Sequence, residues 1–125
     1  MSKEKLVWKK APERADYAAA LAFLSLIFRA PRARALVRAL RAAPVSERSA
    51  KDLLRASGLP LLPREESRVR EDLKRIDKGK PLPQVFLVRG DMAKGMPLIV
   101  ADGYHRICAV CYYDEHAPVA VRMAG

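Results

Sequence analysis

The sequence is poor in cysteine and in aromatic residues, and it has no hydrophobic run long enough to cross a membrane. Its 125 residues include two cysteines and 6% aromatic residues. Two cysteines three positions apart are not the framework of spaced pairs that stabilises small secreted domains, so we expect a reducing, cytoplasmic setting. The longest apolar run, residues 17–28, has twelve residues, against roughly 20 in a membrane-spanning helix. We therefore expect no membrane partner.

Acidic residues are also scarce, mainly in the first half of the chain. The formal net charge is +10, and residues 1–58 hold 13 basic and 5 acidic residues against 11 and 9 in residues 59–125. Such an excess suits nucleic acid, an acidic partner or an anionic surface, or it serves only solubility. The excess of basic residues therefore lies in the N-terminal half, and charge alone does not identify which of these functions it serves.

The first 45 residues are predicted to form a basic helical extension, followed by a domain over residues 46–125. Residues 1–11 are expected to fray, with Trp8 as an anchor on the body of the protein. A helix from Pro12 to about Phe28 is apolar nearly all the way round. Such a helix needs cover on more than one side, from its own domain and from a second subunit in a homodimer.

A second helix of about eleven residues is predicted after Pro31, with one apolar and one basic face. The apolar face holds Leu36, Val37 and Leu40, and the basic face holds Arg34, Arg38 and Arg41. The three arginines either follow the phosphate backbone of DNA or RNA or form a solvated surface.

Two further helices are predicted before the first strand. Ser46 can cap a short helix over residues 49–57 that ends at Gly58, and a charged helix follows from Arg64 to Asp77. These helices suggest a helix-turn-helix as an alternative, although the linker between them, with two prolines, is longer than the three or four residues of that motif.

The remaining residues predict one sheet with a helix. Residues 84–89 and 98–101 are apolar enough for buried strands and are predicted to form a hairpin. A helix over residues 104–113 and a last strand over residues 119–123 follow. The fold class is therefore α+β.

The segment Asp102-Gly103-Tyr104-His105-Arg106 carries a polar cluster where the second strand meets the last helix. Gly103 lets the chain turn, the free N–H groups of the helix favour an anion, and Arg106 adds a planar donor fork. His105 either serves there as a charge or general acid or is a turn residue. Asp102 either forms the turn or holds a metal or a substrate hydroxyl. The segment predicts a phosphate or carboxylate site.

This segment and its flanking elements resemble the ParB/sulfiredoxin-like fold over about residues 59–123. In sulfiredoxins the corresponding turn has the sequence Gly-Gly-Cys-His-Arg, and in ParB N-terminal domains Gly-Glu-Arg-Arg. The resemblance implies a small mixed sheet packed with helices and a nucleotide phosphate bound at Gly103, Tyr104, His105 and Arg106. The implied ligand is ATP or CTP with Mg.

The chain departs from both families in ways that bear on function. Tyr104 occupies the position of the nucleophilic cysteine of sulfiredoxins. Because a phenol cannot replace a thiolate as the nucleophile, sulfinic acid reductase activity is not expected. Glu65 aligns with the lysine that sulfiredoxins have on the preceding helix. We infer that Arg64 or Arg68 supplies the positive charge of that lysine. We expect no counterpart of the ParB regions for DNA binding and dimerisation that follow its N-terminal domain, and therefore do not expect a complete partition protein.

Three functional hypotheses follow. The first is binding of a nucleotide or other phosphate-bearing small molecule at residues 103–106, with Arg68 beside them. The second is nucleic-acid association through Arg34, Arg38 and Arg41. The third is phosphoryl transfer, as in a ParB-like kinase, for which Glu65, Glu66 and Glu71 are candidate bases.

The two cysteines are interpreted as core residues. Cys108 and Cys111 lie too far into the last helix for its N-terminus to activate a thiolate. His105 and Cys111 point some 120° apart on that helix, so we predict no metal site there.

Overall fold

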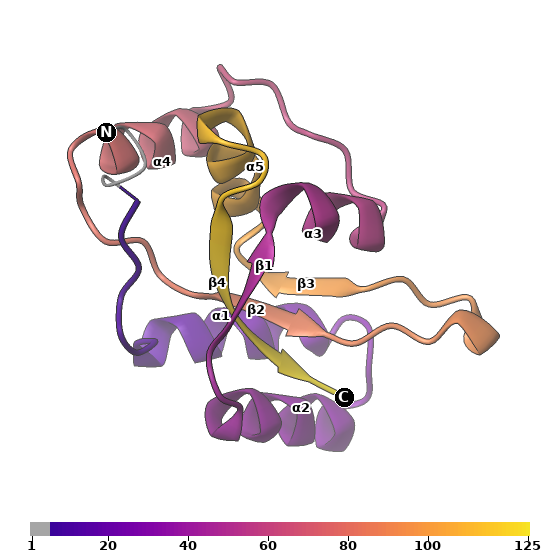
Figure 1. Cartoon of the computed structure of the whole chain (residues 1–125). Helices are drawn as coiled ribbons and strands as arrows, with labels where there is room; N and C mark the ends of the chain where they lie inside the picture. The colour runs from indigo at the N-terminus through magenta and orange to yellow at the C-terminus, as the bar shows by residue number, and fades with distance from the viewer. Residues whose placement is uncertain (1–5) are drawn as a thin grey trace.

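The structure, a computed structural model, describes residues 6–125 and has the predicted α+β architecture. Within these residues, five α-helices surround one mixed four-stranded sheet (Figure 1). The elements are α1 (Arg14–Leu24), α2 (Ala30–Ala42), β1 (Ser46–Ser49), α3 (Ala50–Ser57), α4 (Ser67–Asp77), β2 (Val85–Val88), the short 3-10 helix η2 (Met92–Lys94), β3 (Ile99–Asp102), α5 (Tyr104–Tyr113) and β4 (Pro118–Ala124).

The sheet has the strand order β1-β4-β2-β3. The predicted hairpin is confirmed, because β2 and β3 pair antiparallel. The last strand, β4, lies parallel to β2 on one side and antiparallel to β1 on the other. All four residues of β2 are buried, as its continuous apolar run predicted.

Helices cover both faces of the sheet (Figure 1). Because side chains alternate along a strand, Phe86 and Val88 share a core with α1 and α2, whereas Val85 and Leu87 share one with α3, α4 and α5. Tyr17 of α1 stacks on Phe86, with ring centroids 5.0 Å apart. The apolar face predicted for α2 is buried in the first of these cores. The helices assigned by sequence to an extension therefore lie directly on the sheet.

The strand β1 was not predicted, and the expected cap at Ser46 was wrong. Ser46 pairs with Val121 as the first residue of β1, and the cap of α3 is Ser49, whose Oγ accepts from the N–H of Asp52 at 3.2 Å. The four residues of β1 are all polar, so no apolar alternation marks them as a strand. Their pairing with β4 comes from tertiary context.

Two predicted helix bounds were also wrong. The first helix ends at Leu24 rather than near Phe28. After Leu24 the hydrogen bonds join residues three apart instead of four, from Leu26 N to Phe23 O and from Ile27 N to Leu24 O. The fourth begins at Ser67 rather than Arg64, because the side chain of Glu66 caps it.

The N-terminal segment is held where fraying was expected. Residues 1–5 lie outside the described residues, but Leu82 donates to Val7 O at 2.9 Å and accepts from Lys9 N at 2.8 Å. The side chain of Gln84 also donates to Lys9 O at 2.9 Å. Trp8 is partly buried against the core, which confirms its role as an anchor.

The helix-turn-helix alternative is wrong, because α3 and α4 each pack on α5 rather than on one another. None of the helices within residues 6–125 combines the length and apolar character that a bilayer crossing requires.

Candidate functional site

The site is built around the turn between β3 and α5. Gly103 has φ +112°, a conformation that L side chains rarely adopt. A Cβ atom there would lie 2.7 Å from Val85 Cγ2 and 3.0 Å from Arg106 Nη2. Glycine is therefore required both for the backbone angle and for the close approach of this turn to β2.

The N-terminus of α5 carries no side-chain cap. Its first helical bond runs from Ile107 N to Gly103 O at 3.0 Å, so the three preceding N–H groups have no partner within the helix. By contrast, Ser49 caps α3 and Glu66 caps α4. The start of α5 is thus free to bind an acceptor from outside the chain.

A polar pocket of about 310 Å³ opens beside this turn. It lies between α4, the segment that leads into β2, and the β3–α5 turn. Four of the five residues predicted to bind the ligand, namely Gly103, His105, Arg106 and Arg68, meet in its wall. The full lining is Arg68, Glu71, Asp72, Arg75, Pro83, Asp102, Gly103, His105 and Arg106.

Arg106 is held from two sides. Its Nη2 donates to Asp102 Oδ2 at 3.2 Å and to the carbonyl of Gln84 at 3.1 Å, and its side chain is 15% exposed. Its Nε is buried without a hydrogen-bond partner, a costly state for a charged donor. Asp102, which the sequence left as a turn former or a ligand, orients this guanidinium.

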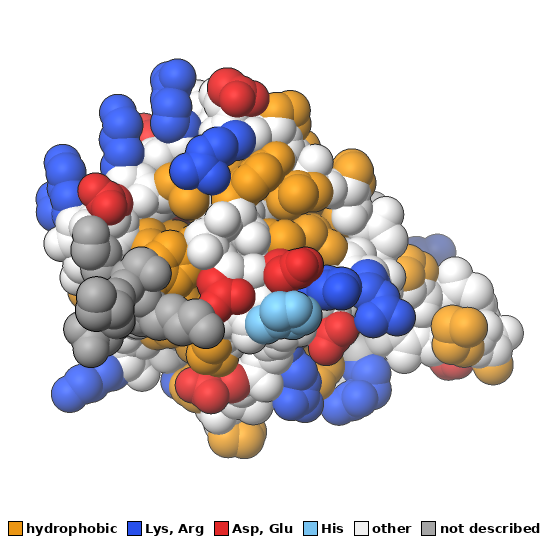
Figure 2. Space-filling view, turned by 45° about the horizontal axis from the view of Figure 1, so that its top comes forward, with side chains coloured by type: hydrophobic (Ala, Val, Ile, Leu, Met, Phe, Trp, Pro, Cys, Tyr) orange, Lys and Arg blue, Asp and Glu red, His pale blue; other side chains and the backbone are white. Residues whose placement is uncertain are grey.

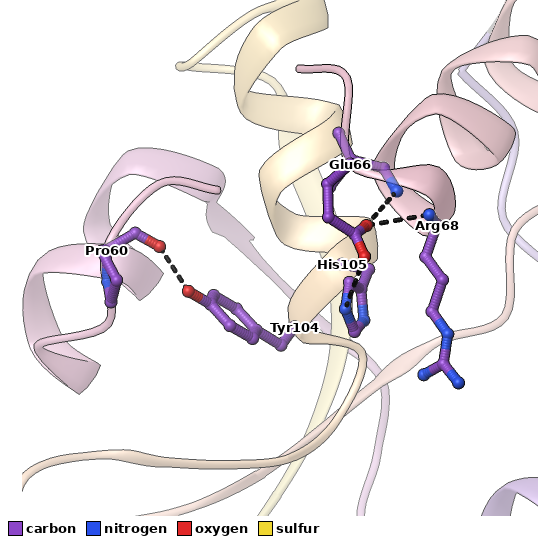
Figure 3. Close-up of polar contacts among 6 residues, drawn as sticks. Pro60, Glu66, Arg68, Tyr104 and His105 are labelled. Carbon is purple, nitrogen blue, oxygen red and sulfur yellow. Dashed lines mark hydrogen bonds and ion pairs between the residues drawn. The ribbon is translucent and has the colours of Figure 1, made fainter. Parts of the chain in front are cut away.

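His105 faces Glu66 from the neighbouring helix (Figure 3). Its Nε2 lies 3.9 Å from Glu66 Oε2. Glu66 Oε1 accepts from the N–H groups of Arg68 at 2.8 Å and of Val69 at 3.0 Å. These bonds, the one from Val69 first, lower the pKa of Glu66, and the charge of His105 adds to the effect. Glu66 therefore presents a charged carboxylate to the histidine.

Tyr104 points away from the pocket, although the sequence placed it among the ligand-binding residues. Its hydroxyl donates to the carbonyl of Pro60 in the linker before α4 (Figure 3). Desolvation raises the pKa of this phenol. Neighbouring helix residues lie about 100° apart, so a helix that turns His105 toward α4 directs Tyr104 toward the linker.

The pocket balances three arginines with three carboxylates. Burial raises the pKa of Asp72, and the charge of Arg106, then of Arg75, opposes that rise. Burial likewise raises the pKa of Asp102 against the pull of Arg106. Figure 2 shows acidic, basic and histidine side chains interleaved on this face of the molecule, with hydrophobic side chains gathered above them. The pocket therefore gains positive charge when either aspartate is protonated.

Sequence reasoning missed Asp72 and Arg75, which share a face of α4 with Arg68. Their spacing of four and seven residues from Arg68 was a readable signal, but which face of α4 meets α5 depends on packing. Of the candidate bases, Glu71 lines the pocket, Glu66 adjoins His105, and Glu65 lines a separate pocket of about 350 Å³.

Arg64 lines that second pocket, so Arg68 is the arginine that reaches the site. The helix α2, which carries Arg34, Arg38 and Arg41, lies on the opposite side of the sheet from α4 and α5 (Figure 1). Arg34 and Arg38 are exposed and form no ion pair within the described part of the chain. The guanidinium of Arg41 instead stacks on Tyr17, 4.0 Å from the ring centroid.

The cysteines belong to the core, as predicted. Cys108 is buried, Cys111 is half-buried against the same core cluster, and burial raises the pKa of both thiols. In the region that the structure describes, no three His, Cys, Asp or Glu side chains converge as a metal ion would require.

Comparison with known proteins finds no protein-family model, no curated protein and no solved structure that matches this chain.

Proposed function

We propose that this chain is a ParB/sulfiredoxin-like domain that binds a phosphate-bearing small molecule in the pocket beside Gly103. The observation that carries the proposal is the meeting of an uncapped helix N-terminus with three arginines in one pocket of about 310 Å³. A phosphate there accepts hydrogen bonds from free N–H groups and charge from Arg68, Arg75 and Arg106. His105 adds a proton donor at the rim.

A nucleotide, ATP or CTP, with Mg is the ligand that the family resemblance favours. Mg²⁺ in such sites is held by one or two carboxylates together with phosphate oxygens. Asp72 fits that role, because Asp102 already pairs with Arg106. The assignment to the cytoplasm remains part of this proposal.

The test is calorimetric titration with ATP, CTP, ADP and inorganic phosphate at low salt, with and without Mg²⁺. We expect Arg68→Gln and Arg75→Gln each to weaken binding about three- to tenfold, because each removes a partly solvated charge from the pocket. The matched control is Arg70→Gln, which lies on the same helix but lines the other pocket.

Binding that survives in Arg70→Gln and falls in the two pocket variants supports the proposal. No binding of any of the four ligands, or an equal loss in all three variants, contradicts it. Tyr104→Phe should bind like the wild type, because its ring faces the linker.

Nucleic-acid association is a second candidate, favoured by α2. This helix carries four arginines and no acidic residue, and Arg34 and Arg38 are exposed. A second copy of the chain is a further proposed partner, through α1.

A further inference from the structure

The charged side chains on the pocket side of α4 do not pair with one another. This side of the helix carries Arg68, Glu71, Asp72 and Arg75, all of which line the pocket beside Gly103. Each of the two arginines lies three and four positions from the two carboxylates, a spacing at which opposite charges on a helix can form ion pairs. Within residues 6–125, however, no ion pair involves any of these four side chains. Charges of both signs are therefore available to a ligand.

The pocket as a whole has no excess of either charge when His105 is counted as neutral. Its lining contains three arginines and three carboxylates, and Arg106 already donates to Asp102 at 3.2 Å. A phosphate ester carries a charge of about −1.5 to −2 at pH 7, so its attraction to the arginines is opposed by repulsion from the carboxylates nearby. A ligand that carries a positive group as well as a phosphate gains from both sets of side chains. The charge balance therefore favours a ligand with charges of both signs.

The size and lining of the pocket favour a small, polar ligand. Its volume of about 310 Å³ lies at the lower end of the roughly 300–1,000 Å³ that is typical of ligand pockets. Among the described residues that line it, His105 contributes the only aromatic ring and Pro83 the only apolar side chain. Because nucleobases are commonly held by stacking on aromatic side chains, this lining offers little to the base of a nucleotide.

We propose that the ligand of this pocket is a small phosphate ester that also carries an ammonium group, joined to the phosphate by a short aliphatic spacer. The phosphate lies at the N-terminus of α5 beside Arg106, and the ammonium lies between the carboxylates of Glu71 and Asp72. This inference rests on the phosphate-binding function proposed above and narrows the class of its ligand. It departs from the nucleotide that the family resemblance favours.

Asp72 is the carboxylate for which a bound ammonium matters most. It is half-buried, and burial raises its pKa, with a smaller rise from the nearby charge of Glu71. An ammonium between the two carboxylates stabilises the charged form of both and has three N–H groups to donate to them. It also offsets the repulsion between Asp72 and the phosphate, as Mg²⁺ would do for a nucleotide. The ester therefore needs no metal ion.

The experiment is calorimetric titration at low salt without Mg²⁺, with 2-aminoethyl phosphate and 2-hydroxyethyl phosphate as ligands. The two esters have nearly the same size, and an ammonium group in the first replaces a hydroxyl group in the second. We expect the wild type to bind the amino ester about three- to thirtyfold more tightly, as two partly solvated charge contacts allow. Inorganic phosphate is the reference for binding of the phosphate group alone.

Glu71→Gln should act differently on the two esters. It removes an exposed carboxylate and should weaken binding of the amino ester about three- to fivefold. The hydroxy ester should bind as tightly as to the wild type or more tightly, because a source of repulsion is lost. Asp72→Asn should act in the same direction. The matched control is Glu65→Gln, which lines the other pocket and should leave the ratio of the two affinities unchanged.

The outcomes separate this inference from the function on which it rests. Tighter binding of the amino ester that falls in Glu71→Gln and is retained in Glu65→Gln supports it, with circular dichroism confirming that each variant is folded. Equal affinities of the wild type for the two esters overturn it, as does an equal change for both esters in Glu71→Gln. If inorganic phosphate binds while the ammonium adds nothing, only the ligand class is wrong. If neither ester nor inorganic phosphate binds, the proposed function fails together with this inference.

Discussion

Glu66 connects two elements of the pocket through one carboxylate. It caps α4 by accepting from two backbone N–H groups, and it faces His105 at the start of α5. Because these interactions favour the charged form, the pKa of Glu66 in the folded protein lies below its ordinary value of 4.5. Its contribution to stability is therefore fully present above that value and is lost as pH falls through the lowered pKa.

Replacing Glu66 with glutamine should lower the thermal midpoint at pH 7, because the amide is a weaker cap without charge. The difference from the wild type should shrink as pH falls below 4.5 and through the lowered pKa of Glu66, because protonation removes the charge that strengthens the cap. Thermal melts followed by circular dichroism across this range measure the effect. The control is Glu65→Gln, an exposed neighbour outside the cap, and equal pH profiles for both variants would refute the assignment.

At the scale of the element, the turn from β3 into α5 is fixed by a single glycine. Gly103 combines φ +112° with the close approach of Val85, a fully buried side chain that a Cβ atom at residue 103 would overlap. Gly58, the C-cap of α3, shares a positive φ of 70° but has open space around its Cα. Alanine substitutions at the two glycines therefore distinguish the cost of backbone strain from the cost of steric overlap.

Gly103→Ala should reduce the free energy of unfolding by about 2–4 kcal/mol, from strain together with overpacking. Gly58→Ala should cost only about 1 kcal/mol, since strain acts alone. Urea denaturation of both variants measures these values. Equal losses would mean that the contact with Val85 relaxes without cost.

Local patterns predicted those elements whose residues carry their own signal. The helix over residues 104–113, the buried face of α2 and the hairpin strands follow from apolar periodicity and turn residues. The strand β1 could not be predicted, because its polar residues pair with β4 from the far end of the chain.

The site divides in the same way. Gly103, His105 and Arg106 were predicted because they are adjacent in sequence, at a turn with its own chemistry. Arg75 and Asp72 were missed, because their position depends on how α4 docks on α5. Tyr104 was placed in the pocket by resemblance, whereas the rotation of α5 directs it to the linker.

At the scale of the whole molecule, the sheet separates two groups of arginines. The pocket lies among α4, α5 and the end of β3, whereas α2, which carries Arg34 and Arg38, lies across the sheet (Figure 1). A ligand in the pocket and a polyanion on α2 would therefore not compete for the same side chains.

If α2 binds nucleic acid, the slope of log affinity against log salt should decrease in magnitude by about 1.8 when Arg34 and Arg38 are both replaced by glutamine, or about 0.9 per phosphate contact. Fluorescence anisotropy with a labelled DNA duplex measures the slope. The matched control replaces Lys51 and Arg55 of α3, two exposed charges across the sheet. A slope that is unchanged in the α2 variant would remove these arginines from the interface.

The position of β4 between β1 and β2 also has a kinetic consequence. The hairpin and β1 have no hydrogen-bonded connection within the described sheet except through this strand, and the residues of β1 and β4 that pair are more than half the chain apart. Closing so long a loop costs entropy before the contacts formed can compensate it. The sheet is therefore expected to assemble late and in one cooperative step. Until then the hairpin has an unpaired edge that is open to aggregation. Formation of the pocket therefore depends on the pairing of β4, although no residue of β4 lines the pocket.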